Sequence, residues 1–205
     1  MLLRILLVST LLFISACQHS PRKEYFALSG TEIAAAKEST AIPSSQIQLS
    51  GSAKNPEKVI GIGPLSIPEY LQHTRISYWK TSNQLMLQEN HYWAEPLEQG
   101  VSRVLGLELQ ATHPQWRVMR FPWRSSQRPA YAIRVDIQRL DAFSDHAIIV
   151  AGLDLIDTKT NTIIRSKQFS SSVASAPHSA AIAQAFSELL QQTAASMDEL
   201  FVTEK

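Results

Sequence analysis

An amphipathic segment that begins at Leu97 constrains the fold more than any other part of the chain. Its apolar residues recur at the spacing of one helix face. They are Leu97, Val101, Val104, Leu105 and Leu109. Pro96 suits the start of such a helix, because its missing N–H leaves no hydrogen bond unmade there. The pattern therefore predicts a helix over residues 97–109 with one face turned to a core.

Alternating or uniformly apolar segments on both sides of this helix predict strands. They cover residues 24–28, 59–62, 75–79, 84–88, 116–121, 131–139, 147–156 and 162–170. The segment 147–156 is apolar at nearly every position, which predicts a central strand covered on both faces. A second helical stripe runs through residues 175–201 and could pack on the sheet or on a partner. Together these elements predict a fold of the α/β class, more narrowly α+β: one mixed, largely antiparallel sheet with two main helices packed on it.

Charge and motif spacing give no support for nucleic-acid binding, catalysis or a metal centre. The chain carries 19 Lys and Arg against 18 Asp and Glu, and we expect no basic cluster. The six histidines are scattered without an H-E-x-x-H pair, and no G-x-S-x-G motif is present. We therefore expect no catalytic residue, no metal ligand and no nucleic-acid partner.

Residues 1–16 have the composition of a secretory leader that ends in small residues. The apolar run 5–14 is shorter than the about 20 residues that a membrane span needs. Ile14-Ser15-Ala16-Cys17 resembles the lipobox of bacterial lipoproteins, which implies cleavage before Cys17 and covalent acyl chains on it. The alternatives are an ordinary secretory signal or an uncleaved anchor. By analogy with lipoprotein sorting signals, Gln18 favours the outer membrane over retention at the inner membrane.

These features divide the chain into three regions. We expect a lipoprotein signal peptide at residues 1–16, an acylated tether at 17–23 and one domain at 24–205. Within the domain, residues 29–58 are rich in Ser, Ala, Thr, Lys and Pro and poor in apolar residues. Since long structureless loops are unusual inside a compact domain, we interpret this segment as a flexible loop. A partner-binding arm is the alternative.

Several short motifs, in the same order and after a lipobox, resemble the PqiC/YmbA family of auxiliary lipoproteins of ABC-type, MCE-linked transport systems. They are Tyr25-Phe26-Ala27-Leu28, Gly61-Ile62-Gly63-Pro64, Ile67-Pro68-Glu69-Tyr70-Leu71, Asn83-Gln84-Leu85, Trp93-Ala94-Glu95-Pro96-Leu97, Gly100 to Leu105, and Phe121-Pro122-Trp123. The chain departs from the family pattern at Gln72-His73, where Asp-Arg is common, and at Tyr92, where Arg is common. Ionic contacts at those positions are therefore not expected to carry over.

The resemblance implies a protein without enzymatic activity that is lipid-anchored at the periplasmic face of the outer membrane. It implies an MCE-domain membrane protein of the same transport system as partner, with a role in lipid transport and envelope integrity. A homo-oligomer is left open, and the covalent acyl chains on Cys17 are the only bound group expected. The alternative function is a structural scaffold lipoprotein of another cell-envelope assembly, without lipid handling.

Two proline-stiffened segments, 64–71 and 92–96, are the candidates for a partner or self-association surface, because rigid aromatic residues are favoured interface anchors. The candidate residues are Pro68, Tyr70, Leu71, Tyr92, Trp93, Glu95 and Pro96. The alternative is that Tyr70, Trp93 and Trp123 simply fill the core over the helix.

Overall fold

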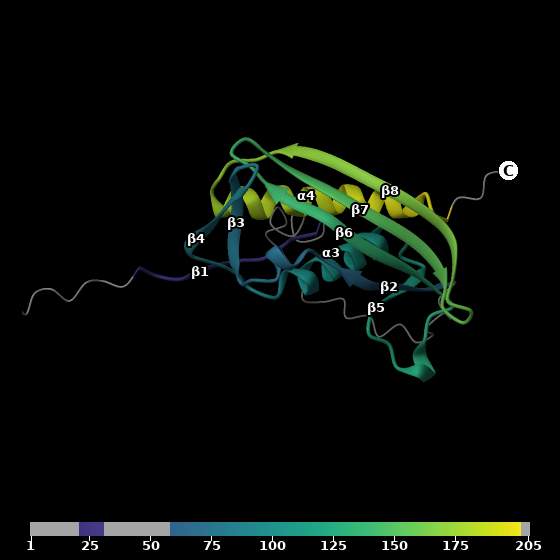
Figure 1. Cartoon of the computed structure of the whole chain (residues 1–205). Helices are drawn as coiled ribbons and strands as arrows, with labels where there is room; N and C mark the ends of the chain where they lie inside the picture. Colours follow the sequence, from purple (N-terminus) through teal and green to yellow (C-terminus); the bar gives the residue numbers. More distant parts are fainter. Residues whose placement is uncertain (1–20, 31–57, 202–205) are drawn as a thin grey trace, which may run out of the picture.

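The computed structural model describes residues 21–30 and 58–201. The predicted signal peptide, the predicted lipidation site Cys17 and nearly all of the predicted loop at 29–58 lie outside the described residues. Within the described part, eight strands alternate with two long helices and two short 3-10 helices (Figure 1). The strands are β1 (Glu24–Phe26), β2 (Lys58–Ser66), β3 (Arg75–Thr81), β4 (Gln84–Trp93), β5 (Trp116–Arg120), β6 (Tyr131–Ala142), β7 (His146–Asp157) and β8 (Thr162–Ala174). The helices are α3 (Leu97–Thr112) and α4 (Ser179–Asp198), with the 3-10 helices η1 (Glu69–Leu71) and η2 (Ser125–Gln127).

The strands of the described chain form two sheets. The larger has the order β5-β2-β6-β7-β8, and the smaller has the order β1-β4-β3. Strand β2 pairs in parallel with β5 and β6, and β1 with β4, whereas the long β6–β7 and β7–β8 pairs are antiparallel. The prediction of a mixed, largely antiparallel α+β fold is confirmed. The prediction of a single sheet is wrong, because the β3–β4 hairpin pairs with β1 and not with the strands that follow it.

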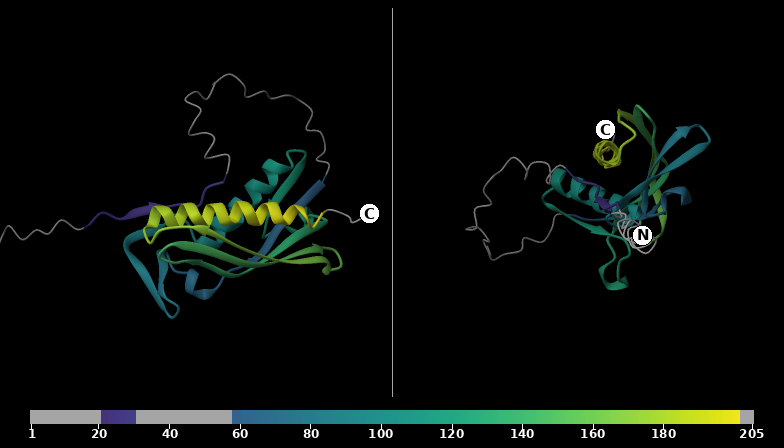
Figure 2. Two further views of the ribbon diagram at one scale, coloured as in Figure 1. Left: turned by 90° about the horizontal axis from the view of Figure 1, so that it is seen from above. Right: turned by 90° about the vertical axis from the view of Figure 1, so that its left-hand side faces the viewer.

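Both helices cover the same face of the larger sheet, as the two views in Figure 2 show. The predicted apolar stripe of α3 is buried along its whole length. Ile182, Phe186 and Leu189 of α4 are buried against the same core as Ile149 and Leu153 of β7. The C-terminal helix therefore packs on its own sheet, and the core lies between the helix layer and the sheet.

The opposite face of the larger sheet is open over most of its area. Along β7, Ile149, Ala151 and Leu153 are fully buried, whereas Ile148 and Val150 between them are only half-buried. The prediction that this strand is covered on both faces is therefore wrong. The neighbours of its outer face on β6 and β8 are polar side chains, which an apolar run on β7 alone does not reveal.

Candidate functional site

The seven predicted interface residues divide by exposure. Leu71 and Trp93 are 4% and 7% exposed and belong to the core. The Trp93 ring stacks on Phe186 of α4, with 6.0 Å between the ring centres. These two residues therefore pack in the core. Pro68, Tyr70, Tyr92 and Glu95 are half-buried, and Pro96 is exposed. Whether any of these contacts a partner stays a prediction.

Tyr70 is held in place by a buried carboxylate. Its hydroxyl donates to Asp141 Oδ1 over 2.6 Å, and its ring meets Trp79 edge-on at 5.6 Å. Asp141 is only 3% exposed and also accepts a 2.8 Å hydrogen bond from Arg139 Nε. Burial, and then the hydrogen bond to Asp141, raise the pKa of Tyr70 above its usual range. Tyr70 thus ties η1 to β6 through its polar end.

Glu95 has a similar structural role at the start of α3. Its Oε1 atom accepts hydrogen bonds from Arg103 Nε at 3.0 Å and Nη2 at 2.5 Å. The same Nη2 atom donates to the carbonyl oxygen of Leu28 at 2.8 Å. Arg103 therefore joins the helix, the loop before it and the segment after β1. A carboxylate engaged in this way is less available to a partner.

Tyr92 lies on the surface where the described chain begins. Its ring is 5.7 Å from that of Tyr25, which is 63% exposed, and Lys23 Nζ lies 5.7 Å from the centre of the Tyr92 ring. Of the predicted residues, Tyr92 and Pro96 thus come nearest to a free contact surface.

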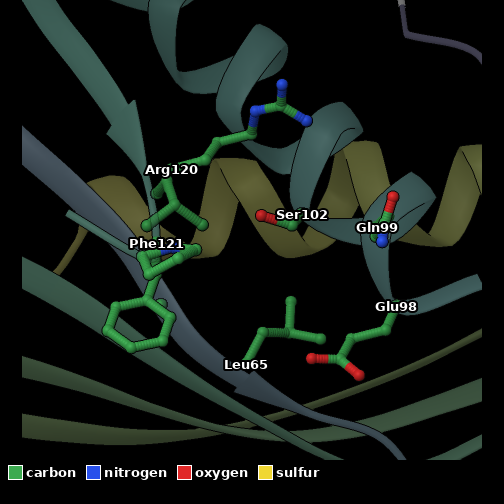
Figure 3. A pocket seen from close by; sticks show the side chains of 9 residues that line it. Leu65, Glu98, Gln99, Ser102, Arg120 and Phe121 are labelled. Carbon is green, nitrogen blue, oxygen red and sulfur yellow. The ribbon is translucent and has the colours of Figure 1, made fainter.

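A cleft of about 520 Å³ opens between the first turns of α3 and the ends of β2 and β5 (Figure 3). Leu65 and Phe121 supply apolar surface, and Phe121 is 51% exposed. Glu98, Gln99 and Ser102 line it from α3, and Arg120 from β5. Its volume and its mixture of apolar surface with a few polar groups lie within the range of small-ligand pockets.

His91, Ser179 and Glu24 resemble a catalytic triad, but a substrate could not reach the serine. His91 Nδ1 lies 2.7 Å from Ser179 Oγ, and His91 Nε2 lies 3.7 Å from Glu24 Oε2. Ser179 is 2% exposed at the first residue of α4, so a substrate carbonyl has no approach to its hydroxyl. The contact instead joins α4 to β4. Among the described residues, no group of three or more His, Cys, Asp or Glu side chains could hold a metal ion.

The structure also brings together a surface that the sequence analysis missed, which we call the cationic end. Its cations are Arg117, Arg124, Arg128 and Lys159, and its large apolar side chains are Phe121, Tyr131, Ile163 and Ile164, all of them exposed. The signal in the sequence is the absence of any Asp or Glu between Glu108 and Asp136. The arginines are too widely spaced there to form a basic run.

The fold and its surfaces define a two-layer α+β domain that offers contact surfaces. No helix among the described residues is long and apolar enough to cross a membrane. The chain belongs to the family of ABC-type transport auxiliary lipoprotein components, whose family model matches residues 41–198. This membership confirms the resemblance found in the sequence motifs.

Curated relatives and solved structures agree with the family. The chain is 23% identical over 124 residues to the intermembrane transport lipoprotein PqiC of Escherichia coli K12, a match that covers 60% of this chain and 65% of the relative. The crystal structure of protein XCC0632 from Xanthomonas campestris, of the DUF330 family, aligns with a TM-score of 0.60 at 16% identity, covering 85% and 91% of the two chains. The crystal structure of an uncharacterized protein aligns with a TM-score of 0.65 at 16% identity, over 89% and 100%. At such identities the two crystal structures show the shared fold alone.

Proposed function

We propose that this protein is a non-enzymatic, lipid-anchored component of an intermembrane lipid transport system at the outer membrane. In this role it docks an MCE-domain membrane protein that reaches across the periplasm, and so supports envelope integrity. The observation that carries the proposal is the family match over residues 41–198, which follows a lipobox ending at Cys17. The relative named as an intermembrane transport lipoprotein supports the same role.

The fold near the N-terminus suits a domain held close to its anchor. β1 begins seven residues after Cys17, and Leu28 behind it is 2% exposed. The backbone N–H of Ser29 donates to Ser187 Oγ of α4 over 3.0 Å. Acyl chains on Cys17 would bind the bilayer with about 0.8 kcal/mol for each buried CH₂ group. Such confinement raises the effective concentration of the domain for a partner that reaches the membrane.

Tyr92 and Pro96 of the predicted interface are part of this proposal. Tyr92 is half-buried beside Tyr25, where the described chain begins, and Pro96 is exposed at the start of α3, so both can contact a partner or a second copy of this chain. Tyr92→Ala removes one ring of the Tyr25–Tyr92 pair and leaves the core residue Trp93 in place. We expect this variant to remain folded and to lose partner or self-association. Normal association by a folded variant would contradict a role for this surface.

Co-isolation from envelopes tests the proposed function. The full-length, tagged protein is expressed from its own locus, the envelope is solubilised in mild detergent, and co-isolated proteins are identified by mass spectrometry. We expect the MCE-domain protein of the same transport system to be enriched. Enrichment of a different envelope assembly without MCE protein would favour a scaffold function instead.

A second arm tests the anchor. Cys17→Ala should carry no acyl chains by mass spectrometry and should no longer fractionate with the outer membrane. Unchanged fractionation of this variant would contradict anchoring through Cys17.

A further inference from the structure

The cationic end carries positive charge that the described part of the chain does not neutralise. None of the ion pairs among the described residues includes any of its four cations. The nearby acids have other partners: Asp154 pairs with Arg134 at 3.9 Å, and Asp157 Oδ1 accepts the backbone N–H groups of residues 159 and 160. An acidic partner surface would supply the missing counter-charges.

The same end also exposes apolar side chains. Four of the six exposed large hydrophobic side chains of the described residues lie here, with exposed fractions of 51% for Phe121, 36% for Tyr131, 53% for Ile163 and 46% for Ile164. Arginine and aromatic residues are the types enriched at protein–protein contacts and among their hot spots. A ligand that satisfied only the charges would leave this apolar surface in water.

A hollow in this surface is lined by basic side chains. It has a volume of about 680 Å³ and lies between the edge of β2 and β5 and the loop that contains η2. Lys58, Arg117 and Arg128 line it together with Tyr131, and no Asp or Glu is among its lining residues. The Lys58 ammonium lies over the rings of Trp116 and Phe201, 5.0 and 4.8 Å from their centres, so Arg117 and Arg128 are the cations left to bind carboxylates there.

The loop that forms one wall of this hollow is fixed to the sheet. Trp123 Nε1 donates to the carbonyl oxygen of Met119 at 3.3 Å, and Arg128 Nη1 donates to that of Thr158, also at 3.3 Å. The Thr158 hydroxyl donates to the carbonyl oxygen of Pro129. Because the loop is already ordered, a partner would not have to order it on binding.

The position of the cationic end favours a protein partner over the anchoring membrane. Helix α4 begins beside β4, where Ser179 contacts His91, and the chain just after the helix packs Phe201 on Trp116 at the start of β5. Its 20 residues span about 30 Å. Strand β1, through which the chain enters, and the loop of the cationic end therefore lie at opposite ends of the molecule (Figure 1). The surface thus points away from the membrane that would hold Cys17.

We propose that the cationic end docks an acidic, partly apolar face of the MCE-domain protein. This inference rests on the proposed function and adds to it the surface used and the charge of the partner. Complementary charge of this kind accelerates association and makes binding sensitive to salt.

The test measures binding of the purified, acylated protein in detergent to the purified periplasmic part of the MCE-domain protein of the same transport system. The double variant Arg117→Glu/Arg124→Glu reverses two exposed charges at the cationic end and leaves in place Arg128, which bonds the loop to Thr158. The matched control, Arg75→Glu/Lys80→Glu, reverses two exposed charges on β3 of the smaller sheet. We expect the first variant to bind about tenfold more weakly or worse, and the control to bind within about twofold of wild type. Wild-type binding should also weaken as the salt concentration rises. All three proteins should have the same melting temperature.

Each outcome has a separate meaning. If the wild-type protein does not bind the MCE-domain protein, the proposed function fails. If it binds and the first variant binds equally well, the docking surface is wrong while the function stands. A third arm compares vesicles of phosphatidylglycerol and phosphatidylcholine. A preference of the wild-type protein for phosphatidylglycerol that the first variant loses, with its MCE binding intact, would make this a lipid-binding surface and overturn the proposal.

Discussion

Replacing Gly61 with alanine should displace the loop that covers the outer face of β2. A Cβ atom at this position would come within 3.0 Å of Trp123, Pro129 and Ala132. Pro129 and Ala132 are buried, so neither can swing aside in a close-packed interior. The Trp123 side chain would have to move to remove the clash, and the loop that carries it would move with it. The substitution therefore tests whether this packing holds the loop of the cationic end in place.

The expected magnitude follows from two opposing effects. Overpacking a well-packed site costs about 1–3 kcal/mol, and three simultaneous close approaches place Gly61→Ala in the upper part of that range. Alanine recovers about 0.5–1 kcal/mol because it restricts the unfolded backbone more than glycine does. The net loss of unfolding free energy should be about 1–2 kcal/mol. For a domain of this size that corresponds to a fall in Tm of about 2–8 °C.

Urea denaturation followed by tryptophan fluorescence measures this effect, with Gly106→Ala as the matched control. A Cβ at Gly106 would lie 3.6 Å or farther from its neighbours and would occupy the interior of α3. The control should gain about 0.5–1 kcal/mol, because alanine favours a helix more than glycine does. If Gly61→Ala is as stable as wild type, or if both variants change stability by the same amount, the close packing of this loop on Gly61 is refuted.

Three further substitutions test individual contacts. Tyr70→Phe should cost about 1.5–3 kcal/mol in urea denaturation, because the buried carboxylate of Asp141 loses a donor. Folding raises the pKa of Tyr70, so the protonated hydroxyl contributes fully to the free energy of unfolding below the unfolded-state pKa of about 10. That contribution falls as pH rises above this value. Stability measured from pH 8 to 11 should therefore fall less steeply in Tyr70→Phe than in wild type. Arg103→Met should speed hydrogen exchange in residues 21–30, because it removes the bonds to Glu95 and to the segment after β1, and unchanged exchange would contradict that link. Phe186→Ala should cost about 3–5 kcal/mol in thermal melting, since its ring is 2% exposed; a loss below about 1 kcal/mol would contradict its place in the core.

Helices were the most predictable part of this fold, because their burial depends on local spacing. The stripe from Leu97 to Leu109 is buried as its period predicts. Pairing between strands depends on contacts that are distant in sequence, and the division into two sheets was missed for that reason. The outer face of β7 was misjudged because Ile148 and Val150 look the same in the sequence whether they face water or a second layer.

The candidate site was less predictable, because residue type does not distinguish a contact surface from a core. Trp93 and Leu71 satisfy every sequence criterion for an interface anchor, yet they are buried. The cationic end is assembled from Arg117 of β5, the β5–β6 loop, Tyr131 of β6, Lys159 in the turn after β7 and the first residues of β8. Only folding brings these segments together, although the acid-free interval before Asp136 is visible in the sequence.

A genetic measurement tests the central claim most directly, which is that this protein works in the same transport route as an MCE-domain protein. Strains that lack this gene, the MCE gene or both are compared for sensitivity to detergents and large antibiotics, which enter when the outer membrane is impaired. We predict that the double deletion is no more sensitive than the MCE deletion alone. Additive sensitivity in the double deletion would show that the two proteins act in separate routes and would contradict the account.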